Sequence, residues 1–179
     1  MVYMLLGTGF EEMEAIAPLD LLRRAGVKVL TVGVAGKQVR GSHGITVEAD
    51  ITLPEMDLTD LEMIILPGGM GGVTTVRGSK ASMDALRFAW ENGKFVAAIC
   101  AGPTVLAKLG ITDGKRVACY PGCEAKMGSA IICEENAVID GRVITGRAPG
   151  AAFDFGLTLV RVLRGEEAAK QVAAGAVYR

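Results

Sequence analysis

Short runs rich in valine, isoleucine and leucine alternate with longer segments of helical periodicity, and this alternation constrains the fold most strongly. It is typical of a mostly parallel β-sheet covered by helices on both faces, because parallel strands are joined by crossover helices. We therefore predict an α/β fold in a single domain spanning residues 1–179. The predicted strands are Val2–Leu6, Lys28–Val34, Met63–Leu66, Phe95–Ile99 and Val117–Tyr120.

Capping and helix-breaking residues set the ends of the predicted helices. Thr8 followed by Glu11 has the spacing of a capping box, and Gly26 ends the helix that follows. Ser79 and Asn92 bracket a second helix. Two more helices are predicted at Pro103–Leu109 and Ala151–Leu163, with two hairpins around Ala35–Lys37 and at Asp140–Gly141.

Charge and hydropathy exclude two kinds of binding partner. The chain carries 19 basic and 20 acidic residues in a mixed order, so it lacks the basic stripe that nucleic-acid binding requires. Its longest uninterrupted apolar run, Phe95–Ala101, is far shorter than the ~20 residues of a membrane-spanning helix. Met1–Leu6 does not resemble a secretory leader. We expect a cytoplasmic protein that binds neither nucleic acid nor membrane.

The four cysteines and the single histidine do not form a metal-binding pattern. Cys-x-x-Cys spacing is absent, and His43 lies far from the cysteines in the first predicted hairpin, where we expect a surface position. We therefore predict no metal. The cysteines are expected to be free thiols in a reducing compartment. We expect Cys119 and Cys133 in strands and Cys123 in a loop.

The segment with the clearest chemical content is an apolar strand that breaks at Cys100. Small residues and Pro103 follow it, as suits the first turn of a helix. This is the pattern of a nucleophile elbow, which strains the backbone and presents the side chain at the carboxyl end of the sheet. A helix N-terminus beside the sulfur also favours the thiolate. The alternative is a buried cysteine that serves as a small apolar side chain.

Two further segments carry groups that a reactive thiol uses. Gly68 and Gly69 follow the third predicted strand and let backbone N–H groups face an anion, although an ordinary flexible loop has the same composition. Surface positions are expected for Glu11 and Glu12, but Glu14 is spaced to point toward the carboxyl edge of the sheet. Beside a thiolate its pKa should be raised by desolvation and like charge, so that the protonated carboxyl donates a hydrogen bond to sulfur.

In this order, five motifs resemble the DJ-one branch of the ThiJ/PfpI superfamily over nearly the whole chain. They are Gly9–Glu14, Arg23–Gly26, Leu66–Gly69, Ala97–Pro103 and Arg147–Gly150. The resemblance implies a flavodoxin-like three-layer sandwich with a nucleophile elbow. It also implies a homodimer, with Met13 and its helix near the interface.

The resemblance assigns roles to particular residues. Cys100 would be an easily oxidised nucleophile, Glu14 its hydrogen-bonded proton shuttle, and the N–H groups of Gly69 and Ala101 the stabilisers of an oxyanion. Further pocket residues would be Gly68, Tyr120, Arg147 and Pro149. Activities in this branch are glyoxalase action without metal or glutathione, disputed deglycation, and an oxidative-stress response with chaperone-like behaviour. No cofactor is implied.

Two departures from the superfamily bear on activity. Ala101 stands where the protease-like branch has a histidine, so a local Cys-His dyad cannot form and peptidase activity is disfavoured. Tyr120 stands where many relatives place a histidine near the cysteine, and tyrosine is a poor base at neutral pH. Glu14 would then carry most of the proton transfer. We expect Cys123 to be an incidental loop residue rather than a resolving thiol.

These observations lead to two expectations from different functional classes. The first is a glyoxalase- or deglycase-type lyase or hydrolase, in which Cys100 handles small reactive aldehydes such as methylglyoxal and yields a 2-hydroxy acid. The second is a redox-sensing or chaperone-like dimer without turnover, switched by oxidation of Cys100.

Overall fold

A seven-stranded sheet in the order β10-β11-β7-β6-β1-β2-β5 forms the middle layer of the computed structural model, which describes residues 1–178. Neighbouring strands are parallel except β10 and β11. The strands are β1 (Val2–Leu6), β2 (Val29–Gly33), β5 (Ile51–Thr52), β6 (Met63–Leu66), β7 (Phe95–Ile99), β10 (Ala137–Asp140) and β11 (Val143–Gly146).

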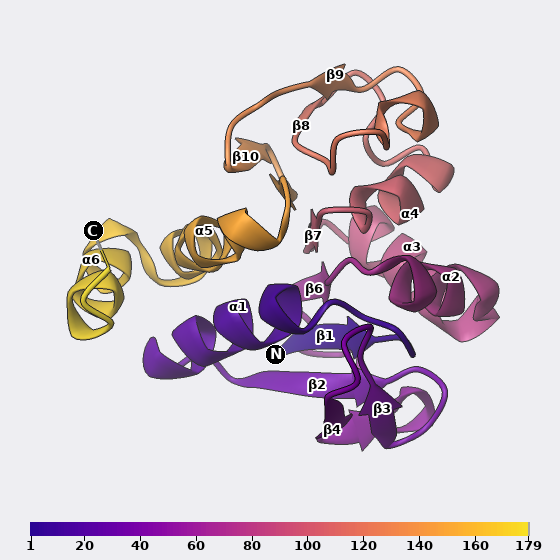
Figure 1. Cartoon of the computed structure of the whole chain (residues 1–179), viewed down its shortest axis with the longest axis horizontal. Helices are drawn as coiled ribbons and strands as arrows, with labels where there is room; N and C mark the ends of the chain where they lie inside the picture. The colour runs from indigo at the N-terminus through magenta and orange to yellow at the C-terminus, as the bar shows by residue number, and fades with distance from the viewer. Residues whose placement is uncertain (179) are drawn as a thin grey trace.

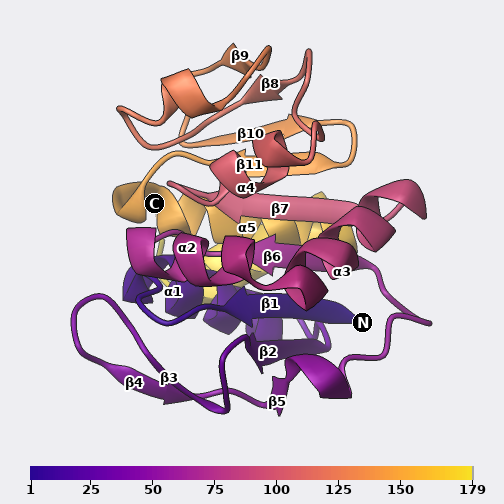
Figure 2. The same ribbon diagram turned by 90° about the vertical axis from the view of Figure 1, so that its right-hand side faces the viewer.

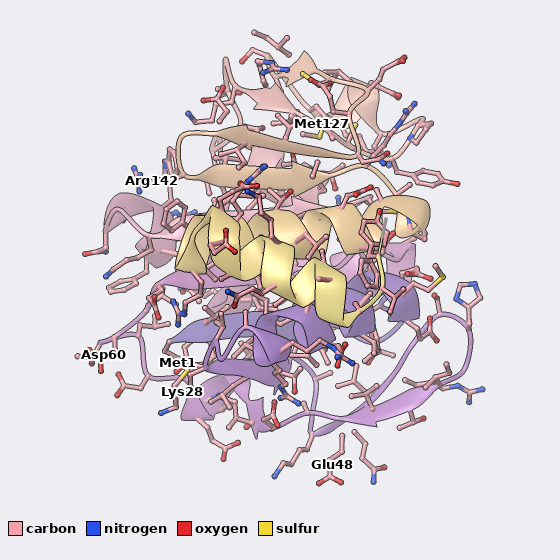
Figure 3. The ribbon with its side chains drawn as sticks, turned by 90° about the vertical axis from the view of Figure 1, so that its left-hand side faces the viewer. Met1, Lys28, Glu48, Asp60, Met127 and Arg142 are labelled. Carbon is pink, nitrogen blue, oxygen red and sulfur yellow. The ribbon has the colours of Figure 1, made fainter. Side chains whose placement is uncertain are left out.

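Helices cover both faces of this sheet (Figures 1 and 2). One face carries α1 (Glu12–Arg24), α5 (Ala152–Arg164) and α6 (Glu166–Gly175), and Figure 3 looks onto α6 from outside. The opposite face carries α2 (Met70–Gly78), α3 (Lys80–Glu91) and α4 (Pro103–Lys108). The predicted flavodoxin-like three-layer sandwich is confirmed. Within residues 1–178, no helix combines the length and the apolar character that crossing a bilayer requires.

The continuous apolar runs of the sequence arise because helices cover the strands on both sides. Every residue of β1, β6 and β11 is buried. The helix α3 shows the matching amphipathic pattern. The Ser79 side chain caps it by accepting a hydrogen bond from the N–H of Ser82, and Ala85, Leu86 and Ala89 follow on its buried face.

The prediction of a central strand at Val117–Tyr120 was wrong. Only β8 (Arg116–Val117) is a strand there, and it pairs with β9 (Ile131–Ile132) outside the central sheet. Beyond β8 the backbone bonds to a side chain instead of a neighbouring strand: the N–H of Ala118 donates to the hydroxyl of Thr145. Cys119 and Cys133 also lie outside strands, contrary to expectation.

The first hairpin lies later in the chain than predicted. The turn around Ala35–Lys37 only leads from β2 into β3 (Gln38–Arg40), and the antiparallel partner of β3 is β4 (Thr46–Glu48). The hairpin turn is therefore at residues 41–45. His43 lies in this turn with a 70% exposed side chain, so its expected surface position is confirmed. The second hairpin forms as predicted, between β10 and β11.

Two helices, α2 and α6, were not predicted. The glycine-rich segment was expected to be a turn, yet α2 begins within it at Met70. Its glycines allow the helix to approach the loop that follows β1, since a Cβ added to Gly72 would lie 2.8 Å from the Cα of Phe10.

A glycine also sets the closest approach of α1 and α5. A Cβ added to Gly156 would lie 2.7 Å from Cδ1 of Leu21 and 2.9 Å from the Cα of Pro18. We expect Gly156→Ala to lower the free energy of unfolding by about 1–3 kcal/mol, because overpacking outweighs the gain of about 1 kcal/mol in helix propensity. Urea denaturation measures this change. Gly78→Ala is the matched control in α2, where an added Cβ meets no atom within 4 Å; equal effects of the two substitutions would contradict this packing.

Candidate active site

The candidate site lies where three adjacent parallel strands end. β6 pairs with β1 on one side and with β7 on the other, so their carboxyl ends meet at one edge of the sheet. The segment after β1 leads into α1 and Glu14, the segment after β6 contains Gly68 and Gly69, and β7 ends next to Cys100. The topology thus brings together residues that are far apart in the sequence.

Cys100 has the strained backbone of an elbow. Its φ is 65°, a left-handed value that is uncommon for a residue with a side chain. Hydrogen bonds hold it on both sides. The N–H of Cys100 donates to the carbonyl of Gly146 at 2.9 Å, and the N–H of Tyr120 donates to the carbonyl of Cys100 at 2.8 Å. The residue is 7% exposed, so the surroundings fix its position while leaving it a small opening.

Gly68 allows the carboxyl group of Glu14 and the thiol of Cys100 to approach each other. Its N–H donates to Oε2 of Glu14 at 2.8 Å. A Cβ on Gly68 would lie 2.5 Å from that same oxygen and 2.8 Å from Cβ of Cys100. Gly69 is equally constrained, with a φ of 82° and the carbonyl oxygen of Gly9 only 2.4 Å from an added Cβ. Neither position tolerates a side chain in this geometry.

Glu14 is fully buried in the first turn of α1. The predicted capping box at Thr8 does not form, because Thr8 lies in the preceding turn. Glu11 caps the helix instead, and its Oε2 accepts the N–H of Glu14 at 2.8 Å. The chain enters the helix through Gly9, whose φ is 83°, and Phe10, whose side chain is buried. This entry turns Glu14 toward the edge of the sheet.

Burial raises the pKa of Glu14 to about 7, and the charge of Glu11 acts in the same direction. Interaction with the Cys100 thiol and the hydrogen bond from the N–H of Gly68 oppose this rise. Among residues 1–178, Oε1 of Glu14 has no hydrogen-bond partner of regular geometry, and the carboxyl group as a whole interacts with the Cys100 thiol. The raised pKa expected from the sequence is present.

The pKa of the Cys100 thiol is raised, whereas the sequence predicted that the thiolate would be favoured. Burial raises the pKa of Cys100, and the adjacent Glu14 carboxylate raises it further. The N–H groups of Ala101 and Gly69 face the sulfur and oppose this rise. The expected lowering by a helix N-terminus does not prevail, because α4 has only six residues and the sulfur is buried. The pair therefore favours one negative charge shared between carboxyl and thiol over two.

The four predicted pocket residues have different surroundings. Gly68 lies against both reactive groups, and Tyr120 contacts the elbow through its backbone with a 47% exposed side chain. The guanidinium of Arg147 instead donates to the carbonyl of Glu134 at 2.9 Å. Pro149 lines an apolar groove of about 540 Å³ on α1, whose lining includes neither Cys100 nor Glu14.

The structure also buries two acidic residues that were expected on the surface. Glu11 is 8% and Glu12 is 6% exposed. The carboxylate of Glu12 accepts hydrogen bonds from both the backbone and the Nδ1 of His43, and from the N–H of Ile45. Burial alone would raise the pKa of Glu12, but these bonds outweigh it and lower the pKa to about 2. An acidic helix start gives no signal of such burial, because the hairpin that covers it is remote in sequence.

Glu11, Glu12 and His43 place carboxylate and imidazole atoms within 4.8 Å of one another. We assign no metal to this group. The oxygens of Glu12 are already occupied by hydrogen bonds to the hairpin, and the positive end of the helix dipole disfavours a cation there. The group instead clamps the start of α1 to the hairpin.

The pKa of Glu14 makes the stability of the fold depend on pH. The unfolded chain releases this proton near the ordinary pKa of 4.5 and the folded chain near 7, so folding loses stability as the pH rises between these values. Across this window we expect the free energy of unfolding of Glu14→Gln to rise relative to that of the wild type by up to roughly 3 kcal/mol. Gln retains an acceptor for the N–H of Gly68, so the substitution keeps that hydrogen bond. Urea denaturation from pH 4 to pH 8 measures the difference, and a difference independent of pH would contradict the assignment.

Comparison with known proteins places this geometry in a family. A sequence model of the DJ-1/PfpI family matches residues 1–162. The protein dj-1beta of Drosophila melanogaster is 37% identical over 174 residues, covering 96% of this chain and 93% of that protein. A Caenorhabditis elegans protein named glutathione-independent glyoxalase DJR-1.2 is 36% identical over 159 residues, covering 88% of this chain and 84% of that protein.

Solved structures agree with these sequence matches. The crystal structure of Drosophila melanogaster DJ-1beta superposes with a TM-score of 0.94 at 36% identity, covering 99% of this chain and 97% of that one. The structure of oxidized Toxoplasma gondii DJ-1 also gives a TM-score of 0.94, at 33% identity and the same coverage. The resemblance drawn from the five sequence motifs is therefore confirmed, and this chain belongs to the DJ-1/PfpI family.

Proposed function

We propose that this protein is a cysteine-dependent, cofactor-independent enzyme of small reactive aldehydes. Its reaction is of the glyoxalase or deglycase type and protects against oxidative stress. One observation carries the proposal. The strained Cys100 thiol, the buried Glu14 carboxyl and the N–H groups of Gly69 and Ala101 converge at one point. The similarity to a nematode protein named as a glyoxalase supports the same chemistry.

The first step is addition to the aldehyde of methylglyoxal. The thiolate of Cys100 forms a bond to the aldehyde carbon, and the carbonyl electron pair moves onto oxygen. The N–H groups of Gly69 and Ala101 stabilise this oxyanion as it forms. The carboxylic acid of Glu14 then gives its proton to the oxygen, which leaves a hemithioacetal and a Glu14 carboxylate.

The second stage moves a proton between the two carbons of the substrate. Glu14 removes the proton from the carbon bonded to sulfur, giving an enediol-like intermediate, and a proton returns to the neighbouring carbon. The former aldehyde carbon is thereby oxidised and the ketone carbon reduced, so no external oxidant is needed. Water then hydrolyses the resulting thioester, which releases lactate and restores the Cys100 thiol.

Steady-state turnover of methylglyoxal, with the product identified, tests this proposal. We expect lactate formation by the wild type and its loss in Cys100→Ala, which removes the nucleophile. We expect Glu14→Gln to slow turnover by about 10²–10⁴-fold, since a positioned acid–base group contributes about that much. Alkylation of Cys100 with iodoacetamide in Glu14→Gln is the control that the thiol remains accessible. Unchanged turnover in Glu14→Gln would remove the proton shuttle from the mechanism.

A redox-responsive role is the second candidate. It is favoured by Tyr120, which adjoins the elbow but supplies no base, since oxidation needs only a reactive thiolate. Hydrogen peroxide converts a thiolate to sulfenic acid by breaking its O–O bond, and a second equivalent gives the sulfinic acid. Absence of turnover in the wild type, together with a gain of about 32 Da at Cys100 under graded peroxide, would favour this role. Peptidase activity is no part of either candidate.

We place either function in a homodimer and in a reducing compartment such as the cytoplasm. Four free cysteines support the reducing compartment. The dimer is supported by an apolar groove of about 540 Å³ on α1. Met13 is 56% and Ile16 42% exposed beside it, and Ile45 of the hairpin is 57% exposed. Exposed apolar groups gathered around one groove are typical of a protein interface.

Light scattering after size exclusion tests the dimer. We expect the wild type to have twice the chain mass of 18.7 kDa, and Ile16→Asp to be monomeric because it buries a charge in the interface. Ile131→Asp on β9 is the matched control, with a side chain that is 56% exposed and distant in sequence from the groove. A monomeric wild type, or equal effects of the two substitutions, would contradict the proposed interface.

A further inference from the structure

Glu11 is a buried carboxylate that the proposed reaction does not use. Its backbone N–H donates to the carbonyl of Gly68 at 3.1 Å, and its Oε2 accepts the N–H of Glu14 at 2.8 Å. These bonds tie it both to the segment after β6 and to the first turn of α1. The position of this carboxylate relative to Glu14 is therefore fixed.

The charge of Glu11 is only weakly neutralised by its basic neighbour, so it still affects Glu14. His43 is the one basic side chain within 4.0 Å of Glu11 among residues 1–178, with Nδ1 at 3.8 Å from Oε1. That Nδ1 lies closer to Glu12, at 3.0 Å, and the His43 side chain is 70% exposed. The imidazole thus pairs with Glu12. The charge of Glu11 raises the pKa of Glu14, whereas the pKa of the Cys100 thiol is raised by burial and by Glu14 and is lowered by the N–H groups of Ala101 and Gly69.

We propose that Glu11 is a positioning residue that shifts the proton equilibrium between Glu14 and Cys100 toward the thiolate. The proposal rests on the proposed function in one respect, that these two groups exchange a proton. A carboxylate fixed beside Glu14 raises the free energy of ionised Glu14, so a larger fraction of Glu14 keeps its proton and the neighbouring thiol is easier to ionise. Without the charge of Glu11, a larger fraction of Glu14 ionises and a larger fraction of the thiol keeps its proton.

Removing the charge of Glu11 should change the rate of Cys100 alkylation in the direction opposite to that expected if Glu11 simply repelled the thiolate. If Glu11 acted directly on the sulfur, removing its negative charge would favour the thiolate and accelerate alkylation. If Glu11 acts through Glu14, removing the same charge shifts the proton to sulfur and slows alkylation. The direction of the change therefore identifies the route.

The rate of Cys100 alkylation by iodoacetamide from pH 5 to pH 9, followed by peptide mass spectrometry, tests the proposal. We expect Glu11→Gln to slow alkylation at pH 7 by about 3–10-fold, as for a shift of about 0.5–1 in the pKa of Glu14. Gln at this position retains an acceptor for the N–H of Glu14. In the Glu14→Gln background, adding Glu11→Gln should leave the rate unchanged, because the intermediate group is gone.

Glu12→Gln is the matched control, since this neighbouring carboxylate faces His43 rather than Glu14. We expect its alkylation rate to stay within about twofold of the wild type, because that charge does not act on Glu14. Faster alkylation in Glu11→Gln would overturn the proposal, as would an equal slowing with and without Glu14. Alkylation requires no aldehyde turnover, so failure of the proposed enzyme activity would leave this test intact.

Discussion

The parallel pairing of β6 with both β1 and β7 is the constraint on which the candidate site depends. Parallel strands end at the same edge of a sheet, so three segments separated by dozens of residues converge there. Their close approach then requires glycine at Gly68 and Gly69, where a Cβ would collide with neighbouring atoms. The backbone of Cys100 is fixed in turn by bonds to β11 and to Tyr120. Sheet topology, glycine sterics and backbone strain thus act together to place one thiol.

The chemistry of the site follows from putting two acidic groups into one buried place. Desolvation raises the pKa of both Glu14 and Cys100. The Glu14 carboxylate raises the pKa of the thiol further, whereas the interaction with the thiol lowers the pKa of Glu14. The site therefore favours a single negative charge over two, and backbone N–H groups from Gly69 and Ala101 reduce the cost of placing that charge on sulfur. This arrangement costs stability at neutral pH. An apolar residue in place of Glu14 would avoid this cost. A buried carboxyl group with a shifted pKa that is present despite its cost is typical of a functional site.

Much of the fold was predictable because its strands and helices carry local signals. Phe95–Ile99 is apolar throughout since helices cover it on both sides, and Ser79 marks the start of α3 by its own side-chain hydrogen bond. The errors arose where remote contacts replaced local preferences. Ala118 bonds to a side chain of β11 instead of a neighbouring strand, and the glycines of α2 serve close packing rather than a free loop.

The sequence by itself determined the fold class, the family and the candidate pair of Cys100 and Glu14, because apolar periodicity and an ordered set of motifs are properties of the chain. Only the tertiary structure decided the electrostatic state of that pair. A pKa depends on burial and on the distances to other charged groups, and a local sequence pattern specifies neither. The same holds for Glu11 and Glu12. Their sequence is typical of a solvated helix start, but in the structure a hairpin some 30 residues away in the chain buries them.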